Sequence, residues 1–304
     1  MPTRISSIGL IAEIDPAALF VYPEQLRRTS LRALPAKPGV YIFRDERDLP
    51  LYVGKSVNIR SRVLAHLRTP QEARLLACSR YVECQRTAGE IGALLLEARL
   101  IKQLQPLHNK KLRRTREMYA VRLEDGSTPA LPQLVSAREH DFAATRNLYG
   151  LFASRQAALD KLRAMVDAHQ LCPAIAGLEK VARGRACFAR QLGRCRGACI
   201  GAESLSEHQA RLRAALQPLQ VLVWPYAGPI GIVEESADCR QIHVIDHWCY
   251  FGSVDADQDA ASLQPPAQRR FDVDTYNILV KPWLQGKLQV TPLATGGGRH
   301  LRQD

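Results

Sequence analysis

The stretch PGVYIFRDERDLPLYVGKSVNIRSRV, residues 38–63, contains two β-rich runs separated by a polar loop. The runs GVYIF and LYVG are rich in β-branched and aromatic residues, and a loop of this length is typical of a hairpin. If Tyr41 lies opposite Tyr52, Asp45 to Asp48 form the loop. Because side chains alternate along a strand, both phenol rings then fall on one face. The stretch predicts an antiparallel hairpin with two tyrosines directed into one space.

A helix is predicted directly after the hairpin. Ser56 or Asn58 can cap its first turn, and apolar residues recur at helical spacing through the segment 59–67. Arg62 and His66 are four residues apart, so they share one face of this helix. The segment therefore adds a guanidinium and an imidazole to the end of the hairpin.

A third strand and a long helix complete a small α/β domain. The strand is RYVECQ, residues 80–85, and Thr87 and Glu90 fit a capping box for a helix that runs to Gln105. Pro106 stops this helix because proline cannot continue the backbone hydrogen bonds. The order strand, strand, helix, strand, helix is typical of an α/β domain.

The long helix carries a carboxylate, Glu97, in the middle of an apolar stripe. At 100° per residue the stripe consists of five residues: Ala93, Leu94, Leu100, Ile101 and Leu104. A carboxylate in this position is costly unless an arginine, a hydrogen-bond network or a metal ion pairs with it. Periodicity alone favours the structural alternatives, in which Glu97 binds a buried arginine or lies at the open edge of the stripe.

The composition excludes several classes of protein. The chain has 304 residues, of which 46% are hydrophobic and 24% charged, as in globular proteins rather than disordered or fibrous ones. No apolar run approaches the roughly 18 to 20 residues of a membrane span, and residues 1–16 hold too short an apolar stretch for a secretory signal. We therefore expect a cytoplasmic protein. Its formal net charge of +12 points to a polyanionic partner.

The rest of the chain mixes short strands with helices. Strands between residues 118 and 151 precede a predicted helix at 155–169, a further helix is predicted at 205–222, and FDVDTYNILVKPWL, residues 271–284, has the composition of a strand. The fold class expected is α+β. Four parts are predicted: an N-terminal extension at 1–32, an α/β domain with a three-stranded antiparallel sheet at 33–116, a middle region at 117–201 that is helical around its cysteines, and a β-rich domain at 202–304 whose tail we expect to be disordered.

Four of the eight cysteines lie in one segment: Cys172, Cys187, Cys195 and Cys199. Because no export signal is present, disulfides are not expected, and a metal centre or plain burial explains the group better. Fourteen, seven and three residues separate them, unlike the paired CxxC motifs of a zinc ribbon. An iron–sulfur cluster, a zinc ion and four buried free thiols stay open as alternatives. Interleaved arginines would stabilise thiolates or an anionic cluster: Arg185, Arg190, Arg194 and Arg196.

The motifs resemble those of a nuclease family. GVY and YVGK, followed by Arg62, His66, Glu97 and Asn109, occur in the order and at the intervals of the GIY-YIG nucleases. The segments LPAKPGVYIF, YVGKSVNIRSRV, LLLEARLIKQLQPLHNKKLR and GRACFARQLGRCRGAC resemble the amino-terminal half of UvrC, the incision subunit of nucleotide excision repair. The chain is too short for the second nuclease and helix-hairpin-helix modules of UvrC. It is similar to single-nuclease homologues of UvrC over almost its whole length.

The resemblance implies a role for most residues of the site. One divalent metal, Mg²⁺ or Mn²⁺, would be bound by Glu97 as its single protein ligand. Tyr52 would act as general base with a pKa lowered by Lys55, and Tyr41 would orient the attacking water. Arg62 would offset charge on the scissile phosphate.

The resemblance leaves other roles open or adds binding elements. His66 would either transfer a proton or hold a phosphate, and Asn109 would contact either the substrate or the hydrogen bonds of the site. The four-cysteine segment is expected to bind an iron–sulfur cluster, as in UvrC. A cationic run would contact the DNA backbone, with a solvated linker as the alternative: Lys110, Lys111, Arg113, Arg114 and Arg116.

The function implied is metal-dependent hydrolysis that makes the 3′ incision beside a lesion, in damaged double-stranded DNA bound by UvrB, with UvrA acting upstream. No GxxxxGK[ST] loop is present, so lesion verification would be delegated to the partners. We expect a monomer without a membrane partner, whose carboxy-terminal part docks UvrB or DNA with the help of aromatic residues: Trp224, Tyr226, Trp248 and Tyr250. The alternatives are a non-catalytic DNA-binding module, against which the intact residue set argues, and a GIY-YIG nuclease of another branch, against which the cysteine segment argues.

Overall fold

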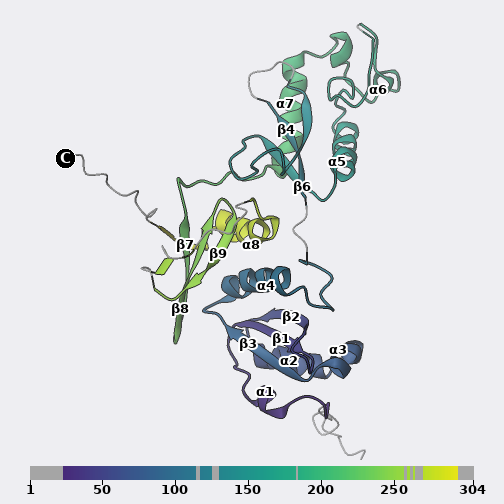
Figure 1. The fold of residues 1–304 in the computed structure, drawn as a ribbon. Helices are drawn as coiled ribbons and strands as arrows, with labels where there is room; N and C mark the ends of the chain where they lie inside the picture. The colour runs from purple at the N-terminus through teal and green to yellow at the C-terminus, as the bar shows by residue number, and fades with distance from the viewer. Residues whose placement is uncertain are drawn as a thin grey trace, which may run out of the picture.

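The computed structural model describes residues 23–113, 117–124, 130–182, 184–256, 259–260, 263 and 270–293. These residues form three units, each built on one antiparallel sheet: a first unit at 23–113, a second at 117–219 and a third at 220–293. Figure 1 shows the third unit between the first, at the bottom, and the second, at the top. The expected α+β class is confirmed. No helix in the described ranges is both long and apolar enough to cross a membrane.

The first unit has the three-stranded antiparallel sheet that was predicted. Its strands are β1 (Gly39–Arg44), β2 (Pro50–Ser56) and β3 (Tyr81–Arg86), and β1 lies in the centre with β2 at an edge. The predicted register was wrong by two residues, because Tyr41 pairs with Gly54 while Tyr52 pairs with Phe43. A shift of two keeps each side chain on its face, so both tyrosines still lie on the same side of the sheet.

Helices cover both faces of this sheet. One face packs on α1 (Arg28–Arg32), α2 (Ile59–Leu67) and α3 (Ala73–Cys78), and the other packs on α4 (Glu90–Leu104). The 3₁₀ turn η1 (Pro70–Glu72) lies between α2 and α3. Asn58 caps α2, since its side-chain oxygen accepts a hydrogen bond from the backbone N–H of Ser61 at 3.0 Å. The tyrosines therefore face α2, while α4 approaches the sheet from the opposite side.

The N-terminus of α4 differs from the prediction. The Thr87–Glu90 capping box was wrong, because the N-cap is Gly89 and the Thr87 hydroxyl donates to the Gly89 carbonyl at 2.8 Å. The backbone N–H groups of Ile91 and Gly92 instead donate to a carboxylate of the third unit, Glu234. The expected end of the helix is correct, since Gln105 closes it in the left-handed conformation with φ of 50°.

The second unit places two helices on a small sheet. The strands β4 (Tyr119–Leu123), β5 (Pro132–Ser136) and β6 (Leu148–Phe152) pair in the order β5-β4-β6, and α5 (Arg155–Ala168) and α7 (Leu205–Leu216) share a core with them. Helix α7 lies within the range predicted for the β-rich domain but packs here. The short elements α6 (Phe188–Gln191), η2 (Ala198–Ile200) and η3 (Gln217–Leu219) complete the unit, with α6 and η2 beside the cysteines.

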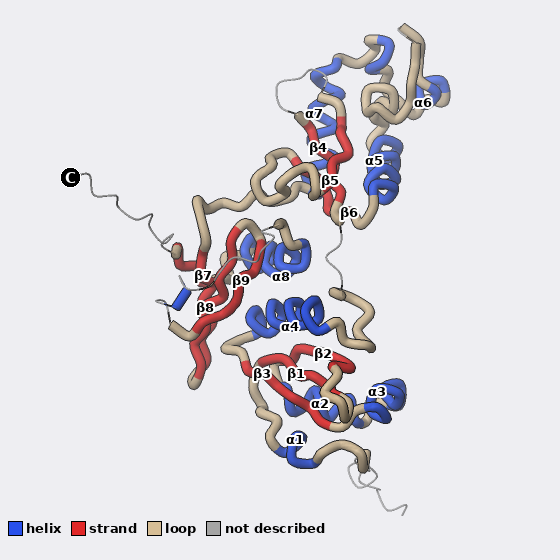
Figure 2. Tube along the Cα trace, viewed as in Figure 1, coloured by secondary structure: helices blue, strands red, loops and turns tan. Residues whose placement is uncertain are grey.

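The third unit is β-rich, as expected, but contains one long helix. Its sheet has the order β10-β7-β8-β9, formed by β7 (Ile230–Ser236), β8 (Cys239–Asp246), β9 (Cys249–Val254) and β10 (Gln289–Pro292). The segment predicted as a strand at residues 271–284 is instead α8 (Val273–Leu284). The prediction was wrong because the β-branched and aromatic content outweighed two helix signals, an Asp272 N-cap and buried residues Tyr276 and Leu279 three apart. Figure 2 shows α8 beside the sheet.

The aromatic residues of the third unit form its interior. Trp224 and Trp248 are only 6% and 0% exposed, and the Trp248 ring makes edge contacts with Tyr276 and Trp283. The expectation that the tryptophans dock a partner is therefore wrong, because their side chains are occupied by the core. This core extends into the other units, since Leu95 of α4 and Ala120 of β4 belong to the same cluster. The third unit is thus joined to both neighbours by buried apolar contacts.

Candidate functional site

Two tyrosines and a histidine meet on the α2 face of the first sheet. The phenol oxygen of Tyr41 lies 2.7 Å from Nε2 of His66, and both side chains are buried. The Tyr52 ring centroid lies 6.2 Å from that of Tyr41 and 5.5 Å from that of His66. Gly54 makes this arrangement possible, because a Cβ atom there would overlap the Tyr41 phenol and the Tyr52 ring. The prediction that Tyr41 and Tyr52 are directed into one space is confirmed, and His66 contacts both of them there.

The environment keeps both phenols protonated. Burial is the main cause that raises the pKa of Tyr41 and of Tyr52, and the charge of Glu97 raises the pKa of Tyr52 further. Arg62 acts in the opposite direction on both groups. The side chain of Arg62 is exposed at the rim of the site, and its hydrogen bond with Tyr41 raises the pKa of the guanidinium. Arg62 is therefore the cation that acts on the phenols.

The expected effect of Lys55 on Tyr52 is not found. Residues 52 and 55 are three apart on β2, so their side chains leave opposite faces of the strand. The Lys55 ammonium lies 2.5 Å from Oε1 of Glu90 at the start of α4, and it is not among the causes that shift the pKa of Tyr52. The prediction that Lys55 lowers the pKa of Tyr52 was wrong because strand alternation was ignored.

His66 has a second partner that the sequence did not reveal. Its Nδ1 lies 3.5 Å from Oε1 of Glu72, which follows in the turn η1. Burial lowers the pKa of His66, Glu72 opposes this shift, and Arg62 adds to it. A neutral ring with its proton on Nδ1 donates toward Glu72 and accepts at Nε2 from the Tyr41 hydroxyl. Glu72 is six residues beyond His66 in a 3₁₀ turn, a spacing that no helical periodicity would have picked out.

The free edge of β2 is covered by the other predicted site residues. Asn109 accepts a hydrogen bond from the Val53 N–H and donates one to the Val53 carbonyl, both at 2.9 Å. The His108 N–H donates to the Leu51 carbonyl at 2.8 Å. At the next outward position, the Lys55 N–H donates to Oε1 of Glu97 at 3.0 Å. Glu97 and Asn109 thus meet at one strand edge, and Asn109 is bonded to the protein backbone rather than directed outward.

Glu97 has the properties of a ligand for a hard cation. Its side chain is half-buried, and burial raises the pKa of the carboxyl group while the Lys55 N–H and the charges of Lys55 and Arg62 lower it. Only Oε1 is engaged in a hydrogen bond among the described residues. A half-buried carboxylate oxygen with an unused lone pair fits Mg²⁺ or Mn²⁺, which prefer oxygen ligands. Glu97 therefore lies in the apolar stripe of its helix because it binds the backbone at the edge of β2, and not because it pairs with a buried arginine.

The cationic run leaves the site directly. Lys110 and Lys111 follow Asn109 and are exposed, whereas Arg113 is half-buried and its guanidinium donates to the Gln105 carbonyl at 3.4 Å. Arg114 and Arg116, like the predicted disordered tail at 295–304, lie outside the described residues.

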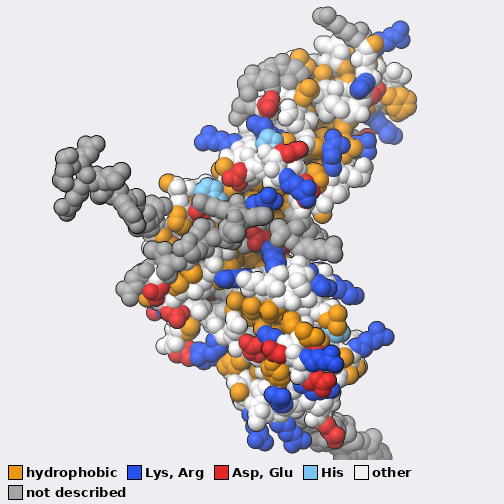
Figure 3. Space-filling view, viewed as in Figure 1, with side chains coloured by type: hydrophobic (Ala, Val, Ile, Leu, Met, Phe, Trp, Pro, Cys, Tyr) orange, Lys and Arg blue, Asp and Glu red, His pale blue; other side chains and the backbone are white. Residues whose placement is uncertain are grey.

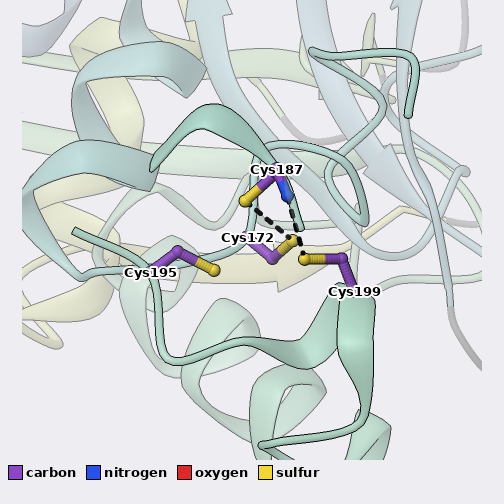
Figure 4. Close-up of side chains that lie close together, drawn as sticks. All are labelled: Cys172, Cys187, Cys195 and Cys199. Carbon is purple, nitrogen blue, oxygen red and sulfur yellow. Dashed lines mark hydrogen bonds between the residues drawn. The ribbon is translucent and has the colours of Figure 1, made fainter. Parts of the chain in front are cut away.

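The four cysteines of the second unit converge, as Figure 4 shows. Their Sγ atoms all lie within 4.8 Å of one another, with Cys172 and Cys187 3.9 Å apart. Burial raises the pKa of Cys172 to about 11 and also raises that of Cys187. Burial likewise opposes ionisation of Cys199, but hydrogen bonds from the Cys187 N–H and the neighbouring thiols lower its pKa overall. Within the described ranges this is the one group of three or more acidic, histidine or cysteine side chains close enough to hold a metal ion together.

The arginines of this segment form no hydrogen bond to a sulfur atom among the described residues. The side chains of all four are exposed: Arg185, Arg190, Arg194 and Arg196. Arg190 donates to the Cys195 carbonyl at 3.2 Å, which holds the loop and not the thiolate. The backbone N–H of Gly197 instead donates to Sγ of Cys195 at 3.2 Å. Backbone N–H groups therefore provide part of the stabilisation of the sulfur atoms that was expected from the arginines.

Comparison with known proteins covers nearly the whole chain. Three family models match: the UvrC-like GIY-YIG domain at residues 37–110, the UvrC/Cho excinuclease middle domain at 118–218 and the excinuclease Cho C-terminal domain at 229–297. Excinuclease cho of Escherichia coli strain K12 is 50% identical over 295 residues, which cover 96% of this chain and 97% of that protein. The Salmonella typhimurium LT2 protein of the same name is 49% identical over 93% of this chain and 95% of its own length.

More distant proteins match only part of the chain. UvrABC system protein C of Methanospirillum hungatei is 31% identical over 61% of this chain and 35% of its own. The GIY-YIG N-terminal endonuclease domain of Thermotoga maritima UvrC, solved with its catalytic magnesium, is 32% identical over 27% of this chain and 93% of that domain, with a TM-score of 0.25. The high identity over nearly the full length of both chains decides against a nuclease of another branch. The chain therefore belongs to the excinuclease Cho family, and it is a DNA endonuclease of nucleotide excision repair with a GIY-YIG nuclease domain.

Proposed function

We propose that this endonuclease makes the 3′ incision beside a lesion in double-stranded DNA bound by UvrB, after UvrA has acted. The observation that carries the proposal is the position of Glu97, whose Oε1 is held by the edge of β2 next to the cluster of Tyr41, Tyr52 and His66. A pure DNA-binding module has no use for a half-buried carboxylate coupled to two phenols. The site therefore supports hydrolysis of a phosphodiester.

Glu97 would hold one divalent cation, and Mg²⁺ is the ion found in the solved Thermotoga maritima domain. A cation with a single protein ligand completes its shell with water and phosphate oxygens, so the substrate contributes to its binding. When bound, such an ion would act as a Lewis acid toward the scissile phosphate. The hydrogen bond from the Lys55 N–H fixes one carboxylate oxygen and leaves the other for this ion.

The remaining side chains would bind and orient the reactants. Arg62 is exposed at the rim and would pair with the scissile phosphate. Tyr52 is the proposed proton acceptor, although its raised pKa means that the phenol is protonated before the substrate arrives. Positive charge that offsets Glu97 would lower this pKa. Tyr41 would orient the attacking water, and His66, whose two ring nitrogens face Tyr41 and Glu72, would hold Tyr41 rather than a phosphate.

The test is the nicking of a duplex with one bulky adduct in the presence of Mg²⁺, UvrA and UvrB. Glu97→Gln keeps an oxygen that accepts from the Lys55 N–H but removes the charge, so we expect binding of DNA without incision. Glu46→Gln, an exposed residue of the hairpin loop, is the matched control and should cut like the wild type. Cutting on the 3′ side that is lost only in Glu97→Gln supports the proposal. Equal cutting by both variants would mean that Glu97 is structural, and no cutting by the wild type would refute the proposed incision in the UvrB complex.

We also propose that the four thiols bind a metal centre. Around a tetrahedral zinc ion with Zn–S bonds of about 2.3 Å the sulfur atoms lie about 3.8 Å apart, close to the 3.9 Å of Cys172 and Cys187. The similarity to UvrC favours an iron–sulfur cluster instead. Elemental analysis of protein purified without oxygen distinguishes iron from zinc, and visible absorption reports a cluster. Cys195→Ser should lower the metal content, whereas protein without either metal would leave four free thiols.

DNA and partner contacts would follow the basic surface. Figure 3 shows Lys and Arg side chains spread from the first unit at the bottom to the second unit at the top of the face drawn. Lys110 and Lys111 are exposed next to Asn109, so they would contact phosphates that flank the cut. We also propose that the protein acts as a monomer in the cytoplasm. When the logarithm of the DNA-binding constant is plotted against the logarithm of the salt concentration, the slope should become shallower by about one for each lysine removed.

A further inference from the structure

A glutamate of the third unit caps the helix that carries Glu97. The first N–H groups of a helix have no partner within the helix, and a nearby side chain usually accepts from them. In α4 the acceptor is Glu234 of β7, which binds the Ile91 N–H at 2.9 Å and the Gly92 N–H at 2.7 Å. Residues 92 and 234 are 142 positions apart in sequence. The cap therefore forms only when the third unit is docked on the first.

The capping glutamate is itself held in place. Nε2 of His243 lies 2.9 Å from Oε2 of Glu234, and Nδ1 of the same ring lies 2.6 Å from the Ser253 hydroxyl, which lies 2.6 Å from the Tyr250 hydroxyl. His243 is fully buried, and its two ring nitrogens contact the Glu234 carboxylate and the Ser253 hydroxyl. The hydrogen bonds with His243, Gly92 and Ile91 lower the pKa of Glu234 in spite of burial, so the cap carries a negative charge at a helix N-terminus.

The helix has no room for another arrangement at this end. A Cβ atom on Gly89 would overlap the Glu234 carboxylate, and one on Gly92 would lie 2.5 Å from Cε1 of His243. Neither glycine is needed for an unusual backbone conformation, since neither has a positive φ. Their small size instead lets β7 and β8 approach the helix closely. This explains Gly92 in the first turn of the helix, where alanine would be the better helix former.

The other end of α4 is bound by the same unit. The Lys102 ammonium lies 2.7 Å from both Asp272 and Asp274 at the start of α8, and all three side chains are largely buried. Between the two ends, the Arg99 guanidinium donates to the Phe251 carbonyl at 3.2 Å. Figures 1 and 2 show α4 between the first sheet and the third unit. Glu97 lies midway between the contacts of Gly92 and of Lys102 with the third unit, on the side of the helix that faces β2.

We infer that Glu234 is a positioning residue for the nuclease: through the cap, the third unit fixes the position of α4 against β2 and hence the Glu97 carboxylate. The inference rests on the proposed role of Glu97 as metal ligand. A residue that orients a metal ligand without touching the metal is expected to change metal affinity or activity by about 10-fold or more when it is replaced. The amino-terminal nuclease unit therefore depends on the carboxy-terminal unit for an accurate site, and not only for partner binding.

The experiment compares three variants of the full chain. Glu234→Gln removes the charge and one of the two acceptors, and Glu235→Gln changes the exposed neighbour on the same strand as a control. Gly92→Ala adds a methyl group that presses on His243 but raises the helix propensity of α4. For each we would measure the single-turnover nicking rate, the Mg²⁺ concentration for half-maximal rate and the affinity for adducted DNA without Mg²⁺.

The expected result separates positioning from folding. Glu234→Gln and Gly92→Ala should each slow nicking about 10-fold or shift the Mg²⁺ requirement upward, with DNA affinity near that of Glu235→Gln. Melting curves should show that both variants are still folded at the assay temperature. Unchanged rates and Mg²⁺ dependence in both variants would overturn the inference. So would a normal rate in Gly92→Ala with a defect in Glu234→Gln, because a cap that matters only for helix formation would be rescued by alanine.

Hydrogen exchange keeps this test independent of the proposed function. In the wild type the amides of Ile91 and Gly92 should be protected, and in Glu234→Gln protection should fall from residue 91 through Glu97 while β1 stays unchanged. If the wild type does not nick DNA, the proposed function fails, yet the exchange pattern still decides whether Glu234 fixes α4. Equal protection in Glu234→Gln and Glu235→Gln would refute the positioning role whatever the activity.

Discussion

Tyr41 and His66 form a buried hydrogen bond, with the phenol oxygen 2.7 Å from Nε2, although they lie on different elements, β1 and α2. Replacing Tyr41 by Phe keeps the ring and leaves Nε2 without a partner in the core. We expect a loss of about 1–3 kcal/mol in the free energy of unfolding and a slower nicking rate. Urea unfolding and the adduct nicking assay measure the two effects, with Tyr119→Phe on β4 as control. A Tyr41→Phe enzyme as fast as the wild type would remove Tyr41 from the site.

His66 should make the protein sensitive to acid. Burial lowers its pKa below the ordinary 6.5, so the unfolded chain takes up the proton at a higher pH than the folded chain does. The stabilisation is therefore complete above about pH 6.5 and is lost as the pH falls through the lower folded value. His66→Gln should unfold with a smaller difference in urea midpoint between pH 7.5 and pH 5.5 than the wild type. His169→Gln, an exposed position, should keep the full difference, and identical behaviour of the two variants would contradict the assignment.

Gly54 should tolerate no side chain. A Cβ atom there would overlap the Tyr41 phenol and come within 2.8 Å of the Tyr52 ring. Gly54→Ala should therefore push both rings aside, cost about 1–3 kcal/mol of stability and reduce nicking more than it reduces DNA binding. Gly177→Ala is not a suitable comparison, because its φ of 71° adds backbone strain. Gly231→Ala in β7 is a matched strand position whose Cβ would meet Ile242 instead, so it should destabilise the protein and leave Tyr41 and Tyr52 in place.

Asn109 should prove sensitive to the loss of its donor. The amide both donates to and accepts from Val53, and alanine removes two hydrogen bonds worth about 1–3 kcal/mol together. Aspartate can still accept from the Val53 N–H but sets its second oxygen against the Val53 carbonyl. We therefore expect Asn109→Asp to be at least as destabilised as Asn109→Ala at pH 7 in urea unfolding. A clearly milder effect of aspartate would mean that Asn109 contributes its oxygen alone.

Local patterns predicted most of the first unit. The hairpin, the Asn58 cap, the third strand and the length of α4 follow from signals within a few residues, and they place Tyr41, Tyr52 and His66 together. The register of the hairpin did not follow, because a pattern with a period of two is equally satisfied by a shift of two residues. The alternation of side chains along a strand does show that Lys55, three residues from Tyr52, lies on the opposite face of the sheet.

Long-range contacts explain what the sequence did not reveal. The cap of α4 comes from Glu234, so the local Thr87–Glu90 pattern was overridden by a partner in another unit. The paired glycines at 89 and 92 were the one sequence signal for that close approach. Helix α8 was mistaken for a strand because β propensity depends on context, and the buried tryptophans were mistaken for surface because aromatic content does not report depth. The four-part division of the chain and the roles of the individual site residues stay predictions.

The covered edge of β2 has a consequence beyond catalysis. An edge strand with open N–H and C=O groups is a template on which another chain can add a strand, and proteins blunt such edges to remain soluble. Here the blunting groups are Glu97, His108 and Asn109, two of which belong to the candidate site. A substitution of Glu97 or Asn109 therefore also exposes backbone groups of β2 to which another chain could bind. Selection for solubility and selection for incision thus act on the same residues.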